Sequence, residues 1–514
     1  ETAHANKNQV YRSDFSFNKI SDDQERMANI PFLITSSRGE KHVVVTDENG
    51  LFDSKSEWYS HEANTNKNDE AVTWNDDGTY FVDQSKLSPE YGLWFTGSKD
   101  FTTSANDAKG AFPYDTYAVE ELRCEANTGY QLIKFTVTVH RNAVHYDLGT
   151  KTDNEVKINT ELGYLDSMED VAPSVGEITL KDVVSYENVN VGTEYKLVGK
   201  LHLQNEDGTD AGVATDAAGN EITSEATFTP VKEEGKTEVE FTFDASNLAG
   251  KTCTAFEYLY EGDTRVAKHE DIEDVEQTIK FPKISTTATV DGEHEADAAE
   301  TVTLKDVVKY ENLVTGKSYA MTGALHYKNT DGSDGGEVVD ENGDPIVSKA
   351  HFEAMEPDGE IELEFTFNAK ALDMAGKTIV AFESLDRSGV SYAVHTDISD
   401  ADQTVQFPKI MTSAKDAVDG DQEVGAFKDQ KVIDEVSYEN VIPGHKYVVK
   451  GTLHSSHKDE AGEVVDDGPV SDGNGNPVEA QTEFTAESTS GNVHVEFNFD
   501  ATGYEGKDFV VFEK

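Results

Sequence analysis

Cysteine is nearly absent from this sequence, which has two among its 514 residues, Cys124 and Cys253. Two cysteines cannot form the disulfide framework that stabilises many secreted domains. Cys253 lies in the apolar run KTCTAFE, where we interpret it as a small buried side chain. If the protein works outside the cell, something other than disulfides has to stabilise it.

Long hydrophobic runs and positive charge are scarce as well. No apolar run approaches the roughly 20 residues of a transmembrane helix. The chain has 43 Lys and Arg against 100 Asp and Glu, a formal net charge of -57 that is spread along its whole length. Nucleic acids and anionic membranes are polyanions and bind through basic patches. The composition therefore predicts no nucleic-acid partner and no membrane contact by this segment.

Glycine and aromatic residues, in contrast, are plentiful, with 39 Gly, 25 Phe and 20 Tyr. Such a composition suits an all-β chain that is rich in turns. At about 150 residues per domain, the length predicts three or four domains rather than one large core.

One sequence unit occurs three times after residue 153. Each copy holds a block of the type DVVxYEN, a block of the type EFTF and a block that ends in AFE or VFE. The first block begins at Lys181, Lys305 and Ile433, the second begins at Val239, Leu363 and Val495, and the third ends at Glu257, Glu383 and Glu513. Apolar residues recur at every second position, which is typical of half-buried strands. A unit of about 126 residues is the size of one β-sandwich and too long for a solenoid repeat.

These copies predict tandem Ig-like or prealbumin-like β-sandwich domains that fold separately. We place the domains at residues 154–281, 282–408 and 409–514, with the last one truncated before its final strand. The joins are short FPKI segments near Pro282 and Pro408. Because proline stiffens a linker, we expect an elongated rod.

Residues 1–153 differ from the repeats and predict a separate β-sandwich with a long insertion. The strand FSFNKI comes first, a polar stretch follows over residues 53–107, and the strands YAVEEL, FTVTVH and AVHYDLG close the segment. All three tryptophans, Trp58, Trp74 and Trp94, lie in it. Exposed tryptophans can form a sugar-binding platform, but three in one sandwich are more often part of the core.

Polar residues recur at fixed positions in the repeats. The frame H-x-D-x-x-D-x-x-Q runs from His269 to Gln277 and again from His395 to Gln403. A threonine in the context I-x-T opens every copy, at Thr160, Thr286 and Thr412, and the glutamine follows it by 117 residues in both complete copies. The first and last strands of a sandwich can be neighbours, so the two groups can meet.

A hydroxyl that faces a carboxamide, with histidine and carboxyl groups nearby, is suited to acyl transfer. Histidine can take the threonine proton, and a carboxylic acid can polarise the amide carbonyl. The product is an ester, and ammonia leaves. The acid has to stay protonated, and Glu257 and Glu383 lie in apolar contexts that favour the protonated form.

The blocks DVVxYEN, EFTF, AFE and HxDxxDxxQT resemble the VaFE repeats of Gram-positive surface proteins, which form an intramolecular Thr–Gln ester in adhesin stalks. The resemblance implies two ester sites, Thr160 with Gln277 assisted by Asp182, Glu257 and His269, and Thr286 with Gln403 assisted by Asp306, Glu383 and His395. The third copy keeps Thr412, Asp434 and Glu513 but has neither the histidine nor the glutamine. Thr412 is therefore expected to stay unpaired unless a strand from elsewhere completes the domain.

The first segment resembles the collagen-adhesin B-type domain, which has the SpaA-like prealbumin fold. That family joins a lysine on its first strand to an asparagine on its last strand, with the help of a glutamate. By this resemblance, Lys19 in FSFNKI forms an isopeptide assisted by Glu121 in YAVEE. We prefer Asn154 as the partner, with Asp153 as a neighbouring candidate and Asn142, in a hairpin turn, as a further one.

The repeated Thr, Gln and His have two alternative interpretations: ordinary strand residues with hydrogen-bonding roles, or a metal site. The HxD pairs offer a glutamine where a metal would need a carboxylate or imidazole. The segments NEDGTDAG and NTDGSDGG resemble calcium loops but lack the spaced glutamate, so we interpret them as hairpin turns. No metal and no cofactor are expected.

These observations favour a structural stalk of a cell-wall-anchored adhesin or pilus-like fibre, located outside the cell and strengthened by its own cross-links. Each cross-link forms once, so the protein is not expected to be an enzyme. The alternative is an extracellular module that binds a glycan or host protein, or a glycan-active enzyme on β-sandwich domains. A host surface protein or glycan is the expected partner, bound through domains that could lie outside this segment.

Overall fold

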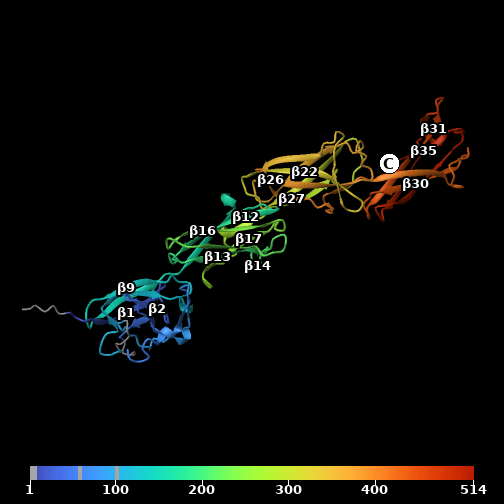
Figure 1. The fold of residues 1–514 in the computed structure, drawn as a ribbon. Helices are drawn as coiled ribbons and strands as arrows, with labels where there is room; N and C mark the ends of the chain where they lie inside the picture. The colour runs from blue at the N-terminus through green and yellow to red at the C-terminus, as the bar shows by residue number, and fades with distance from the viewer. Residues whose placement is uncertain (1–7, 56–60, 99–103) are drawn as a thin grey trace, which may run out of the picture. The chain divides into compact units, whose positions relative to one another are not determined.

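The computed structural model describes residues 8–55, 61–98 and 104–514. Strands dominate it, with a few 3-10 turns between them (Figure 1). The prediction of an all-β chain with tandem β-sandwich domains is confirmed by the separate sheets along the chain. No helix among the described residues is long and apolar enough to cross a membrane.

The N-terminal segment forms two main sheets. One has the order β10-β1-β4, with β7 also paired to β1, and the other has the order β3-β2-β8-β9. The strands are β1 (Arg12–Ser21), β2 (Pro31–Ser36), β3 (Lys41–Val45), β4 (Leu51–Asp53), β7 (Phe112–Pro113), β8 (Asp115–Glu121), β9 (Lys134–Val139) and β10 (His145–Asp153). A short hairpin of β5 (Val72–Trp74) and β6 (Tyr80–Val82) lies in the predicted insertion. Aromatic side chains, among them Phe15, Phe17 and Phe32, fill the core.

The first repeat also has two sheets. The smaller has the order β11-β12-β16, and the larger is built on β13 and β17, with β14 and β15 paired to β13 and with β18 and β19 paired to β17. The strands are β11 (Lys157–Tyr164), β12 (Glu177–Glu187), β13 (Tyr195–Gln204), β14 (Asp210–Val213), β15 (Thr223–Phe228), β16 (Gly235–Asp244), β17 (Thr252–Glu261), β18 (Thr264–His269) and β19 (Thr278–Lys280).

The second repeat has the same topology, with the orders β20-β21-β25 and β23-β22-β26-β27, and with β24 and β28 paired to β22 and β26. The strands are β20 (Lys283–Thr289), β21 (Val302–Glu311), β22 (Ser318–Lys328), β23 (Asp334–Glu337), β24 (Val347–Glu353), β25 (Gly359–Phe367), β26 (Thr378–Arg387), β27 (Val390–His395) and β28 (Thr404–Gln406).

The third repeat has the orders β29-β30-β34 and β32-β31-β33, and β35 also pairs with β31. The strands are β29 (Lys409–Asp416), β30 (Gln430–Glu439), β31 (Lys446–Lys458), β32 (Val464–Pro469), β33 (Glu479–Thr485), β34 (Ser490–Phe499) and β35 (Asp508–Glu513). It has no counterpart of β18 and β19 within residues 409–514, all of which the structure describes.

The period-two pattern explains the two-layer packing. In β16, Val239, Phe241 and Phe243 are buried while the residues between them are exposed. One face of the strand therefore supplies the core, as expected for half-buried antiparallel sheets. Cys253 is also buried, as predicted. The segment NEDGTDAG turns between β13 and β14, as predicted for a hairpin.

Candidate functional site

The first strand of the first repeat brings Thr160 to a buried carboxyl group. In the register of β11 and β12, Thr160 pairs with Val184, so Asp182 is its diagonal neighbour on the same face. Thr160 and Asp182 are both buried, and the Thr160 hydroxyl donates a hydrogen bond to Asp182 Oδ1. The strand register therefore places the Thr160 hydroxyl against the Asp182 carboxyl group, and both are shielded from water.

The second sheet supplies the other half of the same cluster. Glu257 lies on β17, and Gln277 ends the 3-10 turn η5 (Val275–Gln277); both are fully buried. Gln277 Nε2 donates a hydrogen bond to Glu257 Oε2 over 2.9 Å. The first strand and the last segment of the repeat therefore meet in one polar cluster between the sheets, as the 117-residue spacing suggested.

A glycine makes room for this cluster. Gly199 is directly opposite Glu257 in the register of β13 and β17. A Cβ atom at this position would come within 2.6 Å of the Phe241 ring, which belongs to the facing sheet. The missing side chain therefore lets an aromatic ring pack beside the carboxyl group and exclude water from it.

Burial and mutual repulsion raise the pKa values of the two acids. Burial raises the pKa of Glu257 well above its ordinary value, and hydrogen bonding and charge repulsion from Asp182 raise it further. Burial also raises the pKa of Asp182, although hydrogen bonds from Glu257 and Thr160 and the charge of His269 act in the opposite direction. Both shifts favour the protonated form of the pair, and the stronger rise on Glu257 makes that residue the preferred site of the proton.

Asp274 is a candidate site residue that sequence reasoning did not single out. Its Oδ2 is 3.0 Å from His269 Nε2, and its Oδ1 accepts the Glu276 N–H in the turn that ends at Gln277. The Asp274 carboxylate therefore contacts His269 and also caps the turn that carries Gln277. Asp271, the other aspartate of the motif, contacts only a backbone N–H, of Glu273, so the motif alone could not separate the two roles.

The second repeat reproduces the arrangement. The Thr286 hydroxyl donates to Asp306 Oδ1, and Gln403 Nε2 donates to Glu383 Oε2 over 2.6 Å. Burial and Asp306 raise the pKa of Glu383 to about 10. His395 Nε2 lies 2.9 Å from Asp400 Oδ2. The predicted residues of both complete copies therefore come together in the same way.

The third repeat keeps only the acid pair and the threonine. Asp434 is fully buried, and Glu513 at the end of β35 is half-buried. Burial and Asp434 raise the pKa of Glu513 to about 8. Thr412 is exposed, although it lies close enough to Asp434 to lower the pKa of that carboxyl group. Within residues 409–514 nothing corresponds to the histidine or the glutamine.

The N-terminal segment contains a second kind of cluster. Lys19 is fully buried on β1, its Nζ lies 3.5 Å from Glu121 Oε2, and it contacts Asp153 Oδ1. Asn154, our preferred partner, is exposed, and Asn142 accepts the Arg12 N–H in a turn. The geometry therefore favours Asp153 over Asn154 and Asn142 as the partner of Lys19. Successive residues of a strand point to opposite faces, so the neighbour of the inward-facing Asp153 faces away from Lys19.

Burial sets the chemistry of this cluster. It raises the pKa of Asp153 to about 8, with repulsion from Glu121 adding to the effect and Lys19 opposing it. Asn127, a buried residue that sequence reasoning missed, donates from Nδ2 to Glu121 Oε1 over 2.8 Å and fixes that carboxylate. Lysine, a protonatable acid and an oriented glutamate are the groups that amide formation needs.

The tryptophans do not form a shared platform among the described residues. Trp94 is buried under the Arg12 guanidinium, 3.6 Å from the ring centroid. Trp74 is 45% exposed and packs against Tyr80. Trp58 lies outside the described residues.

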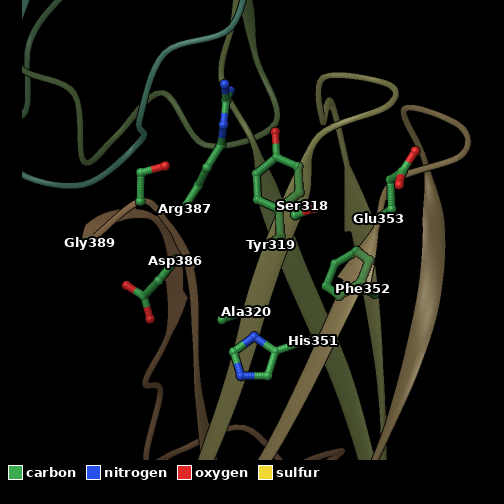
Figure 2. A pocket seen from close by; sticks show the side chains of 10 residues that line it. Ser318, Tyr319, Ala320, His351, Phe352, Glu353, Asp386, Arg387 and Gly389 are labelled. Atoms are coloured by element: carbon green, nitrogen blue, oxygen red, sulfur yellow. The ribbon is translucent and has the colours of Figure 1, made fainter.

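A surface pocket of the second repeat lies apart from the Thr–Gln cluster. Figure 2 shows Tyr319, Phe352 and Arg387 among its lining residues. It includes none of the predicted site residues. Searched over the described residues, the structure has no group of three or more His, Cys, Asp or Glu side chains that could hold a metal ion.

Fold and site together define a class of β-sandwich domain whose first strand and last segment meet in a buried cluster of Thr, Asp, Glu and Gln. The sequence matches the model of the T-Q ester bond containing domain over residues 148–281, 282–407 and 408–514. The chain therefore belongs to this family.

Several solved structures are similar to this chain. A bacterial adhesin from Mobiluncus mulieris, containing intramolecular disulfide, isopeptide and ester bond cross-links, aligns with 46% of this chain and 81% of its own at 17% identity and a TM-score of 0.24. The major pilin subunit of Bacillus cereus aligns with 76% of this chain and 94% of its own at 13% identity and a TM-score of 0.22. The full-length major pilin SpaD from Corynebacterium diphtheriae aligns with 74% and 88% at 12% identity and a TM-score of 0.21. No curated protein matches the sequence.

Proposed function

We propose that this chain is part of a structural stalk on the surface of a Gram-positive cell, as in an adhesin or pilus-like fibre, and that cross-links made by its own side chains stabilise it. The stalk is extracellular and anchored to the cell wall in the full-length protein. The observation that carries the proposal is the recurrence of one buried cluster in both complete repeats, since a turnover site would need to occur only once.

The proposed reaction joins Thr160 to Gln277 and Thr286 to Gln403. In the first repeat, the Thr160 hydroxyl oxygen attacks the side-chain carbonyl carbon of Gln277 and a C–O bond forms. Asp182, which already accepts the hydroxyl hydrogen bond, takes the proton. The C–N bond then breaks, and the nitrogen leaves as ammonia. No redox change or cofactor is involved.

Glu257 is positioned to complete the proton transfer. It hydrogen-bonds to Asp182 on one side and to the Gln277 nitrogen on the other. A proton accepted by Asp182 can therefore pass through Glu257 to the departing nitrogen. This path revises the expected role of His269, whose Nε2 faces Asp274. His269 instead lowers the pKa of Asp182 and so favours the deprotonated carboxylate that can accept the hydroxyl proton.

An ester at this place would stabilise the sandwich in two ways. In the unfolded-state model, closing a loop of this length contributes about 4.7 kcal/mol. A closed covalent loop also cannot be extended by force or threaded by a protease, so unfolding becomes slower. Tension would pass from one domain to the next without unravelling the sheet.

A second cross-link is proposed in the N-terminal segment, between Lys19 and Asp153. The neutral Lys19 amine attacks the Asp153 carboxyl carbon, an amide forms, and water leaves. The raised pKa of Asp153 favours the protonated carboxyl from which water can depart. Glu121 lies close enough to accept the amine proton.

The test of the proposal is the intact mass of purified wild type and of the variants Thr160→Ala and Thr286→Ala. The wild type is expected to be lighter than its sequence by one ammonia for each ester and one water for the amide. Each variant should regain one ammonia. A wild type with the full sequence mass would reject the cross-links.

A further inference from the structure

We infer that three sequence blocks build a lock at each join between repeats, in which a glycine before the join and an asparagine after it hold the same backbone carbonyl. The blocks are AGK at residues 249–251 and 375–377, FPK at residues 281–283 and 407–409, and YEN at residues 310–312 and 438–440. The proposed ester sites use none of these residues. The lock keeps the join closed to proteases.

The asparagine of YEN donates its side-chain amide to the join. Asn312 and Asn440 follow directly after β21 and β30, with positive φ angles of 62° and 59°. Asn312 Nδ2 donates to the Phe281 carbonyl over 3.1 Å. Asn440 Nδ2 donates to the Phe407 carbonyl over the same distance. Asparagine tolerates the left-handed conformation better than most residues, so one residue supplies both the turn and the donor.

The YEN asparagine of the first repeat makes the equivalent contact. Asn188 has a φ of 59°, and its Nδ2 donates to the Glu155 carbonyl over 2.8 Å. Glu155 lies two residues before β11, as Phe281 and Phe407 lie two residues before β20 and β29. All three repeats therefore fix the chain at the same distance before their first strand.

The glycine of AGK holds the phenylalanine carbonyl from the other side of the join. The Gly250 N–H donates to the Phe281 carbonyl over 3.0 Å. The Gly376 N–H donates to the Phe407 carbonyl over 2.8 Å. These four residues lie in one compact unit of the structure. A carbonyl oxygen has two lone pairs, so it can accept the glycine and the asparagine bond together.

The block FPK fits around the shared carbonyl. The phenylalanine ring is fully buried in both joins, and the proline after it restricts its backbone to an extended conformation. The lysine stem lies over the glycine. A Cβ atom at Gly250 would come within 3.0 Å of Lys283 Cδ, and one at Gly376 within 3.4 Å of Lys409 Cδ. Both glycines also have a positive φ, which glycine adopts without strain.

The join before the third repeat uses the whole asparagine amide. Asn440 Nδ2 also donates to the Lys377 carbonyl over 2.7 Å, and Asn440 Oδ1 accepts the Thr378 hydroxyl over 3.0 Å. Three hydrogen bonds therefore depend on this one side chain. We expect its removal to have the larger effect of the two joins.

The lock protects segments that the proposed esters leave open, and this interpretation alone rests on the proposed function. The two ester loops would span residues 160–277 and 286–403. Residues 278–285 and 404–411, which contain the joins, lie outside both loops. A protease that cut a join would separate the repeats even if both loops were closed. Non-covalent contacts have to protect the joins instead.

The experiment is limited trypsin digestion of the whole protein, with each cleavage site assigned by mass spectrometry. Each join contains one exposed trypsin site, after Lys283 and after Lys409. Asn440→Ala should speed cleavage after Lys409 at least about fivefold, because the closed join loses hydrogen bonds, and should leave cleavage after Lys283 unchanged. Asn312→Ala should do the reverse, so each join is the control for the other.

Two further variants separate the hydrogen bonds from the backbone conformation. Asn440→Gly keeps the positive φ but loses the side chain, and Asn440→Asp keeps the shape but loses the amide donor. Both should open the join as Asn440→Ala does, while cleavage after Lys450 within β31 stays at the rate of the wild type. If Asn440→Gly resists trypsin like the wild type, the asparagine serves the turn alone and the inference is wrong.

Other outcomes would also overturn the lock. Equal acceleration at both joins, no acceleration after Lys409, or a parallel rise after Lys450 would show that Asn440 does not act on its own join. The intact mass of the same samples reports the esters separately. Missing mass deficits would reject the proposed cross-links and leave the lock standing, whereas a failed digestion pattern would reject the lock alone.

Discussion

The second and third repeats share the same acid pair and differ in what covers it. In the second repeat, β27, the turn after it and β28 cover the pair, Thr286 is 6% exposed, and the pKa of Glu383 is about 10. Within residues 409–514 no strand pairs with β35 on that side, Thr412 is exposed, and the pKa of Glu513 is about 8. In the second repeat, the segment that carries the glutamine therefore also excludes water from the acid that the proposed reaction uses as a proton donor.

The largest effect is expected from removing one ester. Thr286→Ala should lower the unfolding free energy of the second repeat by about 4.7 kcal/mol, because the unfolded chain regains the entropy of an open loop. Thermal unfolding and protease digestion measure this effect. Thr287→Ala, which changes an exposed residue of the same strand, is the matched control and should change little. Thr412→Ala should also change little, and an equal loss in both repeats would contradict the comparison.

The cluster of Lys19, Glu121 and Asp153 offers the same kind of test for the proposed amide bond. Asp153→Asn should still permit the link to Lys19, with ammonia leaving in place of water, because the carbonyl carbon stays in position. Lys19→Met should abolish the link and lower the melting temperature. If Lys19 and Asp153 form only an ion pair, Lys19→Met also destabilises the domain, because it leaves a buried carboxyl group without its partner; the peptide map, and not the melting temperature, therefore separates the two cases. Peptide mapping then shows an unmodified Lys19 peptide in the wild type.

Asp400 and Asp397 provide a matched pair within one motif. Asp400 holds His395, whereas Asp397 bonds only within its own turn, to Ser399. Asp400→Asn should slow ester formation after refolding by at least about tenfold, since the histidine loses its partner. The pH profile of the rate should shift too. Asp397→Asn, which removes a charge near His395 but no hydrogen bond to it, should change the rate much less, and equal rates for the two variants would show that Asp400 has no positioning role.

The unreacted site also makes the stability of the second repeat depend on pH. Glu383 has a pKa near 4.5 when unfolded and about 10 in the fold, so the native state binds a proton that the unfolded state releases between these values. The unfolding free energy of the Thr286→Ala variant should therefore fall as pH rises from about 5 to 9. Denaturant titrations at several pH values measure it. Adding Glu383→Gln should flatten this part of the curve, and a stability that rises over the same range would contradict the assignment.

The sequence predicted more of the ester sites than of the isopeptide site. Thr160 and Gln277 could be found because two copies repeat their spacing, and a repeat shows which polar residues are fixed. The N-terminal segment occurs once, so nothing could decide between Asp153 and Asn154. A shift of one residue turns a side chain to the other face of a strand, and the register with β1 appears only in the fold.

Roles that depend on local geometry were equally hard to predict. Asp271 and Asp274 look alike in the motif, and the direction of their side chains is set by the turn that leads to Gln277. Asn127 is distant from any motif and reaches Glu121 through a short turn after β8. Gly199 matters because of a ring on the facing sheet, which the sequence of its own strand does not indicate.

The intact mass of the whole untreated protein, followed by a map of its linked peptides, tests the central claim most directly. The account predicts a mass below that of the sequence by two molecules of ammonia and one of water. The linked peptides should pair Thr160 with Gln277, Thr286 with Gln403, and Lys19 with Asp153, and Thr412 should be free. A full sequence mass, with every one of these residues recovered unlinked, would contradict the account.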